Sequence, residues 1–405
     1  MQTRLVLLLF IFVLMFAGAG VYLLHASHAA SPLTGDLNGD GSVNIFDLSI
    51  FLTHWQQPNA SGLPEDFNGD GKVDIFDLSI LLSNYGESVS GNGQTLNCAP
   101  TSSNTMTNTV SHLCGFADTT NTGTNGTLYP ASTGPGPNTG SGWSWDGYTI
   151  ATTADNAVIK NVSCSSCQII VTNPGTSIQN VNIANNGGAG SSNGAIAILG
   201  VNNVTVDHST IHGIGQGTGS SSDWCGVGIQ TLWVSGKDNP DNYTLTNNNI
   251  YWCSNPTNNF INGGLVKNNY MHDFANSSTG SHYEAMQLQS YVENGNLLTI
   301  QDNTLLNSHL DQTAAIILSN DCNSPCTPLP ENNRIITHNL LGGGGYTFYG
   351  KASAGAPNST NITFTNNDIT PLFPPQWGAD ANWTSGGGNV WSGNIWDNTG
   401  ATWSP

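Results

Sequence analysis

The stretch Tyr243-Thr-Leu-Thr-Asn-Asn-Asn-Ile250 decides the fold of most of this chain, because variants of it recur along the sequence. Leu265-Val-Lys-Asn-Asn-Tyr-Met271 and Leu298-Thr-Ile-Gln-Asp-Asn-Thr-Leu305 have the same order of parts: a short alternating strand, a polar pair and a second apolar run. The spacing of equivalent apolar residues, about 20 to 40 positions, is typical of a solenoid or a propeller. Further copies lie at 158–162, 178–183, 204–211, 335–341, 362–369 and 390–395.

The recurring asparagines decide between a solenoid and a propeller. A propeller blade needs four antiparallel strands, whereas each repeat here has a short strand, an Asn-Asn or Asn-Gly pair and another strand. Asparagine tolerates a left-handed backbone and can hydrogen-bond to the asparagine of the next coil. Residues 140–405 therefore resemble the right-handed parallel β-helix of the pectate-lyase-like superfold. The segment Cys114–Gly123 resembles the start of secreted bacterial β-helix proteins, in which a capping region precedes the first coil.

Two loops near the N-terminus are near copies of each other. Asp36-Leu-Asn-Gly-Asp-Gly-Ser-Val-Asn-Ile-Phe-Asp47 is followed by Asp66-Phe-Asn-Gly-Asp-Gly-Lys-Val-Asp-Ile-Phe-Asp77. Both place oxygen side chains at positions 1, 3, 5, 9 and 12 and glycine at position 6, which is a calcium-loop pattern. With the main-chain carbonyl at position 7, the expected ligands of two Ca²⁺ ions are Asp36, Asn38, Asp40, Ser42, Asn44, Asp47, Asp66, Asn68, Asp70, Lys72, Asp74 and Asp77.

Each loop runs into an apolar helix, in which Leu48, Phe51 and Trp55 fall on one face of the first copy. Glycine and proline replace the preceding helix of an EF-hand. Residues 34–87 therefore resemble a type I dockerin, a module that binds cohesin domains on scaffold proteins. The identical pairs at positions 10 and 11 would allow docking in two orientations; alternatively they pack between the helices of a calcium-stiffened spacer. The resemblance implies a cohesin-binding role for Ile45, Phe46, Ile75 and Phe76.

The chain opens with Arg4 and an apolar run from Leu5 to Leu24, followed by small residues as far as Ala30. This pattern is typical of a secretory signal, and the run is also long enough for an uncleaved membrane anchor. In both cases we expect the remainder to be secreted or on the cell surface, where eight cysteines predict disulfides. Proximity suggests the pairs Cys98–Cys114, Cys164–Cys167, Cys225–Cys253 and Cys322–Cys326, although Cys164 and Cys167 could instead form a redox or metal pair.

The charge balance excludes one class of partner. With 26 acidic residues against seven lysines and arginines, and a net charge of −19, the chain lacks the basic footprint of a nucleic-acid-binding protein. A surface with so few cations also suits a neutral glycan better than a polyuronate. The expected organisation is a mainly β chain with a signal or anchor at 1–30, a small α-helical dockerin at 34–87, a linker at 88–97 and the β-helix with its N-terminal cap at 98–405.

Three stretches, 282–289, 312–319 and 346–351, can be aligned as neighbouring coils of that β-helix. When Met286, Ile316 and Phe348 point inward, polar residues form outward rows about 4.8 Å apart from coil to coil. Such rows suit a groove for an extracellular polysaccharide, because amides and carboxylates bond hydroxyls and aromatic faces stack on sugar rings. The expected substrate-binding residues are Gln230, Gln287, Gln289, Tyr346 and Tyr349.

Two reactions fit such a groove. Glu284 with Asp311 could be the acid and base of a glycoside hydrolase. Lys351 or His282 could instead abstract the proton α to a uronate carboxyl in a polysaccharide lyase. The polygalacturonase signatures of the superfold are not intact here. Two further classes stay open: a non-catalytic glycan-binding or adhesive surface protein, and a structural protein in which a retained anchor holds a spacer and a solenoid outside the cell.

Overall fold

The computed structural model divides into two compact units, Met1–Val89 and Ser90–Pro405. In the first unit it describes residues 34, 35, 37, 43, 45–56 and 63–84. The second unit is described from residue 116 onward, except for 186–193, 216–224, 233, 235–240, 259–262, 276–282, 290–295, 310–313, 320–329, 352–356 and 398. No helix in these described ranges is long and apolar enough to cross a membrane. The predicted signal or anchor at 1–30 lies outside them.

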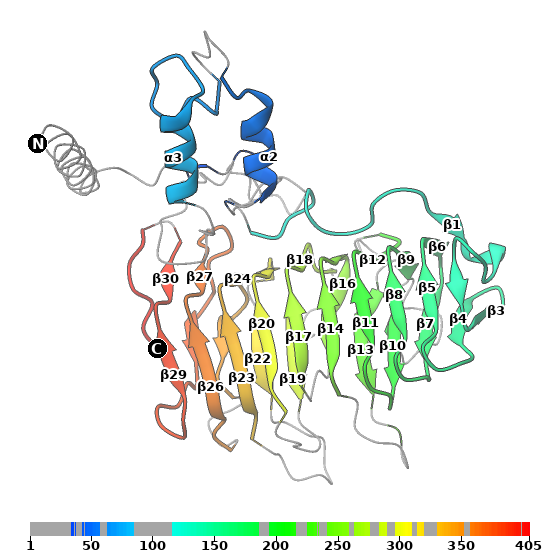
Figure 1. Ribbon diagram of the computed structural model, residues 1–405. Helices are drawn as coiled ribbons and strands as arrows, with labels where there is room; N and C mark the ends of the chain where they lie inside the picture. Colours follow the sequence, from blue (N-terminus) through cyan, green and yellow to red (C-terminus); the bar gives the residue numbers. More distant parts are fainter. Residues whose placement is uncertain are drawn as a thin grey trace, which may run out of the picture. The chain divides into compact units, whose positions relative to one another are not determined.

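The first unit is built on two short helices, α2 (Ile45–Thr53) and α3 (Ile75–Ser83) (Figure 1). A capping box between Asp74 and Asp77 begins α3. The two sequence copies contribute equivalent residues to one core, in which four side chains are completely buried. This shared core explains why neither short helix has to be stable alone. The four residues are Val43, Phe51, Val73 and Leu81.

Three sheets, each with ten strands among the described residues, make up the second unit (Figure 1). Sheet 1 contains, in spatial order, β1 (Tyr129–Pro130), β6 (Val162–Ser165), β9 (Asn182–Asn185), β12 (Thr210–Gly213), β15 (Asn249–Tyr251), β18 (Tyr270–His272), β21 (Thr304–Asn307), β24 (Leu340–Gly343), β27 (Asp368–Ile369) and β30 (Ile395–Trp396). Sheet 2 contains β3 (Trp143–Trp145), β4 (Thr149–Thr152), β7 (Gln168–Val171), β10 (Ile196–Leu199), β13 (Cys225–Leu232), β16 (Cys253–Asn258), β19 (Glu284–Gln289), β22 (Ala314–Ser319), β25 (Tyr346–Tyr349) and β28 (Gly378–Ala381). Sheet 3 contains β2 (Gly140–Ser141), β5 (Val158–Lys160), β8 (Ser177–Gln179), β11 (Thr205–Asp207), β14 (Tyr243–Thr246), β17 (Gly264–Lys267), β20 (Leu298–Gln301), β23 (Asn332–Thr337), β26 (Thr360–Thr365) and β29 (Val390–Ser392).

The chain winds through sheet 3, sheet 1 and sheet 2 in turn, so that each coil adds one strand to every sheet. Neighbouring strands are parallel, except where β2 meets β5 and β3 meets β4 at the N-terminal end. The predicted parallel β-helix is therefore confirmed. Its N-terminal end is closed by β1–β3 and a short 3-10 helix, η1 (Ala131–Thr133). Trp143, the first residue of β3, packs into the core.

Asparagine fixes the turn between sheet 3 and sheet 1, as the sequence pattern predicts. The first residue of each polar pair has a left-handed backbone, with φ of 57° at Asn247 and 54° at Asn268. The second residue is fully buried, and its Nδ2 donates to the Oδ1 of its counterpart one coil on, at 2.9–3.0 Å. We call this buried row the asparagine ladder; its members are Asn248, Asn269, Asn303, Asn339, Asn367 and Asn394.

The segment after Cys114 does not cap the coils but lies along the outer side of sheet 1. The main-chain nitrogens of Gly123 and Thr124 donate to the Asn247 carbonyl oxygen (2.8 Å) and the Thr210 hydroxyl (3.0 Å). Ala117 packs against Tyr270 of the same sheet. The chain therefore crosses several coils from outside before the cap begins at β1, because the exposed side of sheet 1 carries apolar residues that need cover.

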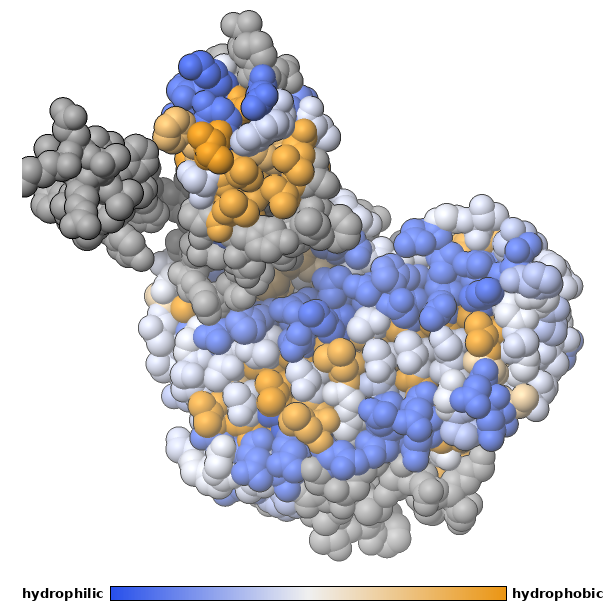
Figure 2. Space-filling view, in the orientation of Figure 1, coloured by the Kyte–Doolittle hydropathy of each residue, from blue (hydrophilic) through white to orange (hydrophobic). Residues whose placement is uncertain are grey.

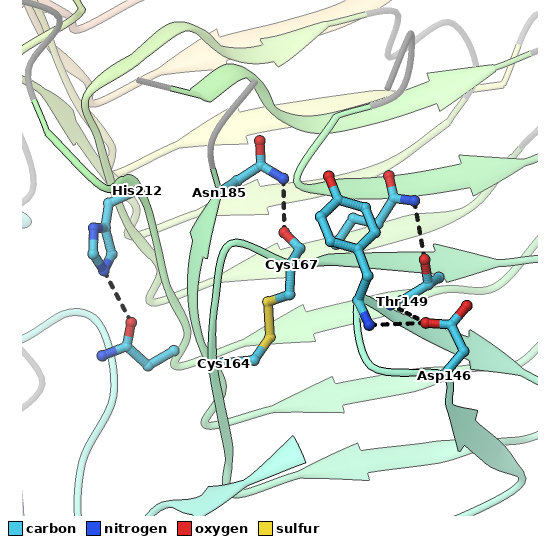
Figure 3. Close-up of a disulfide and its surroundings, with 9 residues drawn as sticks. Asp146, Thr149, Cys164, Cys167, Asn185 and His212 are labelled. Carbon is cyan, nitrogen blue, oxygen red and sulfur yellow. Dashed lines mark hydrogen bonds between the residues drawn. A yellow bond between two sulfur atoms is a disulfide. The ribbon is translucent and has the colours of Figure 1, made fainter. Parts of the chain in front are cut away.

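Two of the four predicted disulfides are present. Cys164 is bonded to Cys167 at the corner between β6 and β7, where Asn185 donates to the Cys167 carbonyl oxygen at 2.7 Å (Figure 3). Cys225 and Cys253 are register partners on β13 and β16 and are bonded across the coils. The first pair is therefore a disulfide in this structure and not a metal pair. The pairs Cys98–Cys114 and Cys322–Cys326 lie outside the described residues.

Candidate functional sites

The second of the two predicted calcium loops has its carboxylates turned into the loop. Asp66 at position 1 accepts from the main-chain nitrogens of Asp70 (3.1 Å) and Gly71 (2.9 Å). Asp77 at position 12 is completely buried and accepts from the nitrogens of Asn68 (3.2 Å) and Asp74 (2.9 Å). Gly71, at position 6, adopts φ +81°, as the sharp turn requires. Hard oxygen donors in this arrangement fit Ca²⁺.

The first loop lies largely outside the described residues, and with it Asp36, Asn38, Asp40, Ser42 and Asn44. Its last residue, Asp47, is completely buried like Asp77, and its Oδ1 accepts from the Leu37 nitrogen at 2.9 Å. Both position-12 aspartates are therefore buried and accept a main-chain hydrogen bond from the start of their own loop, as expected of two copies of one site.

The start of α3 presents apolar side chains to solvent. Ile75 and Phe76 are 60% and 64% exposed, and Leu52 and Leu82 also lie on the surface, where apolar side chains gather (Figure 2). The alternative in which the Ile-Phe pair packs between the two helices is thus wrong for the second copy. Exposed apolar residues of this kind mark interaction surfaces. The side chains of Ile45 and Phe46 lie outside the described residues.

The predicted polar row on sheet 2 is present in the register of the strands. Gln287 pairs through Ile317 with Tyr349, as the alignment of inward residues requires. Gln230 belongs to the same row but stands two coils from Gln287, because Asn258 lies between them. The sequence comparison missed Asn258, whose strand contains Pro256 and lacks aliphatic alternation.

The candidate acid Glu284 faces a more enclosed environment than a groove residue would. It is 2% exposed, and its carboxylate accepts from the Nδ2 of Asn255 on the neighbouring coil. Burial, with the nearby charges of Tyr346 and Glu284, raises the pKa of Tyr349. Two of the other three acid–base candidates, Asp311 and His282, lie outside the described residues, as does the side chain of Gln289.

The two remaining predicted residues lie at the C-terminal end of the row. The Nζ of Lys351 donates to the Asn358 Oδ1 at 2.9 Å. Tyr346 lies 5.3 Å from Tyr349 between ring centroids, with the rings nearly perpendicular. On its other side Tyr346 is 5.7 Å from the ring of Trp377, which is 55% exposed and which sequence reasoning missed. The signal available for it was a tryptophan directly after the Pro-Pro-Gln turn.

A second pair of carboxyl groups, also missed, lies on sheet 1. Asp368 on β27 is 2% exposed, and burial together with the charge of Asp397 raises its pKa to about 8. Burial raises the pKa of Asp397 to about 6, although a hydrogen bond from Thr370 opposes the shift. Asp368 therefore keeps its proton near neutral pH. It is too deeply enclosed to meet a polymer, so its role here is in stability.

Comparison with known families agrees with this geometry for the first unit. Residues 34–85 match the family of dockerin type I domains, whereas no curated protein matches the chain. The chain thus carries a type I dockerin domain, followed by a large domain of three parallel sheets. Type I dockerins bind calcium, and the module implies attachment to a cohesin in an extracellular cellulosome.

Proposed function

We propose that the β-helix acts on an extracellular polysaccharide and that the dockerin places it on a cohesin-bearing scaffold. The observation that carries this proposal is the row on sheet 2, where Gln230, Asn258, Gln287 and Tyr349 share one register line. At about 4.8 Å per coil, the line covers about 19 Å, which suits a polymer better than a small metabolite.

A neutral glycan is the substrate class that the charges favour. The described strands of sheet 2 contain no lysine or arginine, and Lys351, just beyond β25, is already bonded to Asn358. A polyuronate would need cations along its length to offset its carboxylates. The amides of the row can both donate to and accept from neutral hydroxyls.

For the reaction itself, we propose hydrolysis with Glu284 as the general acid and Asp311 as its partner. What supports this role is position, because Glu284 lies on β19, the strand that also carries Gln287 of the row. Elimination through Lys351 or His282 is the alternative reaction. For docking, we propose two Ca²⁺ ions held by the twelve loop positions, and a cohesin contact made by Ile45, Phe46, Ile75 and Phe76.

The burial of Glu284 favours a second candidate, a non-catalytic glycan-binding or adhesive protein. Glu284 and Asn255 are 2% and 8% exposed and bond to each other, which also suits a purely structural polar contact between coils. In that case the row on sheet 2 would bind a glycan without cleaving it.

A panel of neutral and acidic polysaccharides, assayed for new reducing ends and for the ultraviolet absorbance of unsaturated products, separates these candidates. Hydrolysis gives reducing ends alone, and elimination gives both signals. We expect Glu284→Gln to lower cleavage at least about tenfold. Asp302→Asn, which changes a half-exposed carboxylate in the turn after β20, should leave cleavage unchanged. Saturable binding without products supports the non-catalytic candidate. A protein that neither binds nor cleaves any member of the panel overturns the proposal.

A further inference from the structure

An exposed tryptophan lies beside the C-terminal end of the polar row, four residues before Ala381, which continues the register line of Tyr349. Trp377 lies in the turn between β27 and β28 and is 55% exposed. A tryptophan normally buries much of its large apolar surface. An indole left open to water beside a row of amides is therefore a candidate contact for a ligand.

The backbone holds Trp377 in place. The main-chain nitrogens of Gln376 and Trp377 donate to the carbonyl oxygens of Gly344 (3.0 Å) and Gly345 (2.8 Å). The next residue, Gly378, has φ +155°, and a Cβ there would lie 3.2 Å from the ring of Tyr346. Tyr346 therefore packs directly against the Gly378 backbone. The backbone of the turn is thus bonded to the preceding coil, so ligand binding would not have to order it.

The ring geometry joins Trp377 to the row. Tyr346 is 5.7 Å from Trp377 with the planes tilted by 57°, and 5.3 Å from Tyr349 at 85°. Tyr349 is itself a member of the row. The three aromatic rings thus lie next to one another. Ile317 separates Tyr349 from Gln287, the last amide of the row.

An unsatisfied acceptor lies further along the same row. The Oδ1 of Asn258 is buried and has no hydrogen-bond partner in the described structure. Buried polar atoms are normally bonded. The Oε1 of Gln230, one coil away, accepts from the Gly194 nitrogen at 3.0 Å and is therefore satisfied. Asn258 differs from Gln230 in lacking such a bond, and a sugar hydroxyl could supply it.

From these observations we infer that Trp377 and Tyr346 form a stacking subsite for a pyranose ring of a neutral polysaccharide, whose chain continues along the coils past Gln287 to Asn258. The apolar C–H face of a pyranose fits an aromatic plane, and its hydroxyls fit the amides. This inference rests on the proposed function and adds the direction of the bound chain and its anchor.

Calorimetric titration with soluble cello-, xylo- and manno-oligosaccharides, from disaccharide to hexasaccharide, tests the inference. Affinity of the unaltered protein for at least one series should rise with length. Trp377→Ala should raise the Kd of the hexasaccharide at least about tenfold, while Trp377→Phe retains most of the binding. Leu297→Ala is the matched control, since Leu297 is 50% exposed beside β20 on sheet 3. Unchanged thermal unfolding of each variant excludes a folding defect.

The outcomes separate the subsite from the function. If Trp377→Ala binds the hexasaccharide as tightly as the unaltered protein, the subsite is wrong and the proposed function stands. If affinity does not rise with length, the chain does not follow the row. If the unaltered protein binds no oligosaccharide and cleaves no polysaccharide, the proposed function falls together with the inference.

Discussion

Asp368 should make the β-helix more stable in acid than at neutral pH. Its carboxyl group is buried on β27 of sheet 1, one coil from Asp397. The Oδ1 atoms of both aspartates are buried without a hydrogen-bond partner in the described structure. Two carboxylates in such a place oppose each other's charge and are poorly hydrated. Asp368 therefore stays protonated in the folded protein at neutral pH, whereas the unfolded chain ionises it, and this difference lowers the stability. Asp368→Asn is neutral in both states and should therefore stabilise the protein at neutral pH.

The magnitude follows from the pKa of Asp368, which rises from 3.8 to about 8 in the folded protein. Because the folded state holds the proton more tightly than the unfolded state, this contribution is fully present below pH 3.8 and is lost as the pH rises to about 8. Between pH 3.8 and pH 7 the free energy of unfolding therefore falls by ~1.4 kcal/mol for each of about three pH units, which gives about 4 kcal/mol.

Urea unfolding of the β-helix between pH 4 and pH 8, at a fixed calcium concentration, measures this effect. We expect the free energy of unfolding of Asp368→Asn to exceed that of the unaltered protein by up to about 4 kcal/mol at pH 7, with the difference vanishing near pH 4. Asp155→Asn removes an exposed carboxylate bonded only to Asn173 in the described structure and should show no such divergence. Parallel pH profiles for the unaltered protein and Asp368→Asn would refute the reasoning.

Three further predictions concern the ladder, the inter-coil disulfide and the dockerin. Asn303→Ala leaves buried main-chain and amide groups without partners on both sides and should lower the free energy of unfolding by about 3 kcal/mol or more, measured in urea. Replacement of Cys225 and Cys253 by serine should cost roughly 3 kcal/mol, and a reducing agent should then destabilise the unaltered protein more than this variant, which keeps only the Cys164–Cys167 bridge among the described cysteines. A chelator should abolish cohesin capture and lower the melting temperature of the dockerin. Replacement of both Phe46 and Phe76 by alanine should abolish capture with little change in calcium affinity, because neither docking orientation then has its aromatic contact. Capture that survives both treatments would contradict the docking model.

The solenoid could be predicted because its instructions are local. Each Asn pair specifies both a left-handed turn and a buried amide, and alternation then fixes which side chains point inward. The register of Met286, Ile316 and Phe348 followed from that alternation alone and is confirmed. Asn258 was missed because Pro256 interrupts the pattern in its strand.

Environment, in contrast with register, depends on neighbours that sequence spacing does not identify. The enclosure of Glu284 is set by Asn255, which lies in a coil outside the three that were aligned. Asp368 occupies an outward position, like Thr304 in an earlier coil, and only the later Asp397 changes its chemistry. Trp377 lies in a turn whose backbone is bonded to Gly344 and Gly345. The spacing of apolar residues in the sequence does not predict the exposure of a side chain in such a turn.

The asparagine ladder also bears on how such a chain can change in length. The amides from Asn248 to Asn367 all donate toward the next coil, so each coil offers the preceding one an identical acceptor. Loss or duplication of one whole coil would bring asparagine against asparagine again, whereas a break inside a coil would leave an amide facing a carbon side chain. Deletion or duplication of whole coils is therefore the tolerated change of length. A natural variant that is one coil shorter or longer should still form an unbroken asparagine ladder.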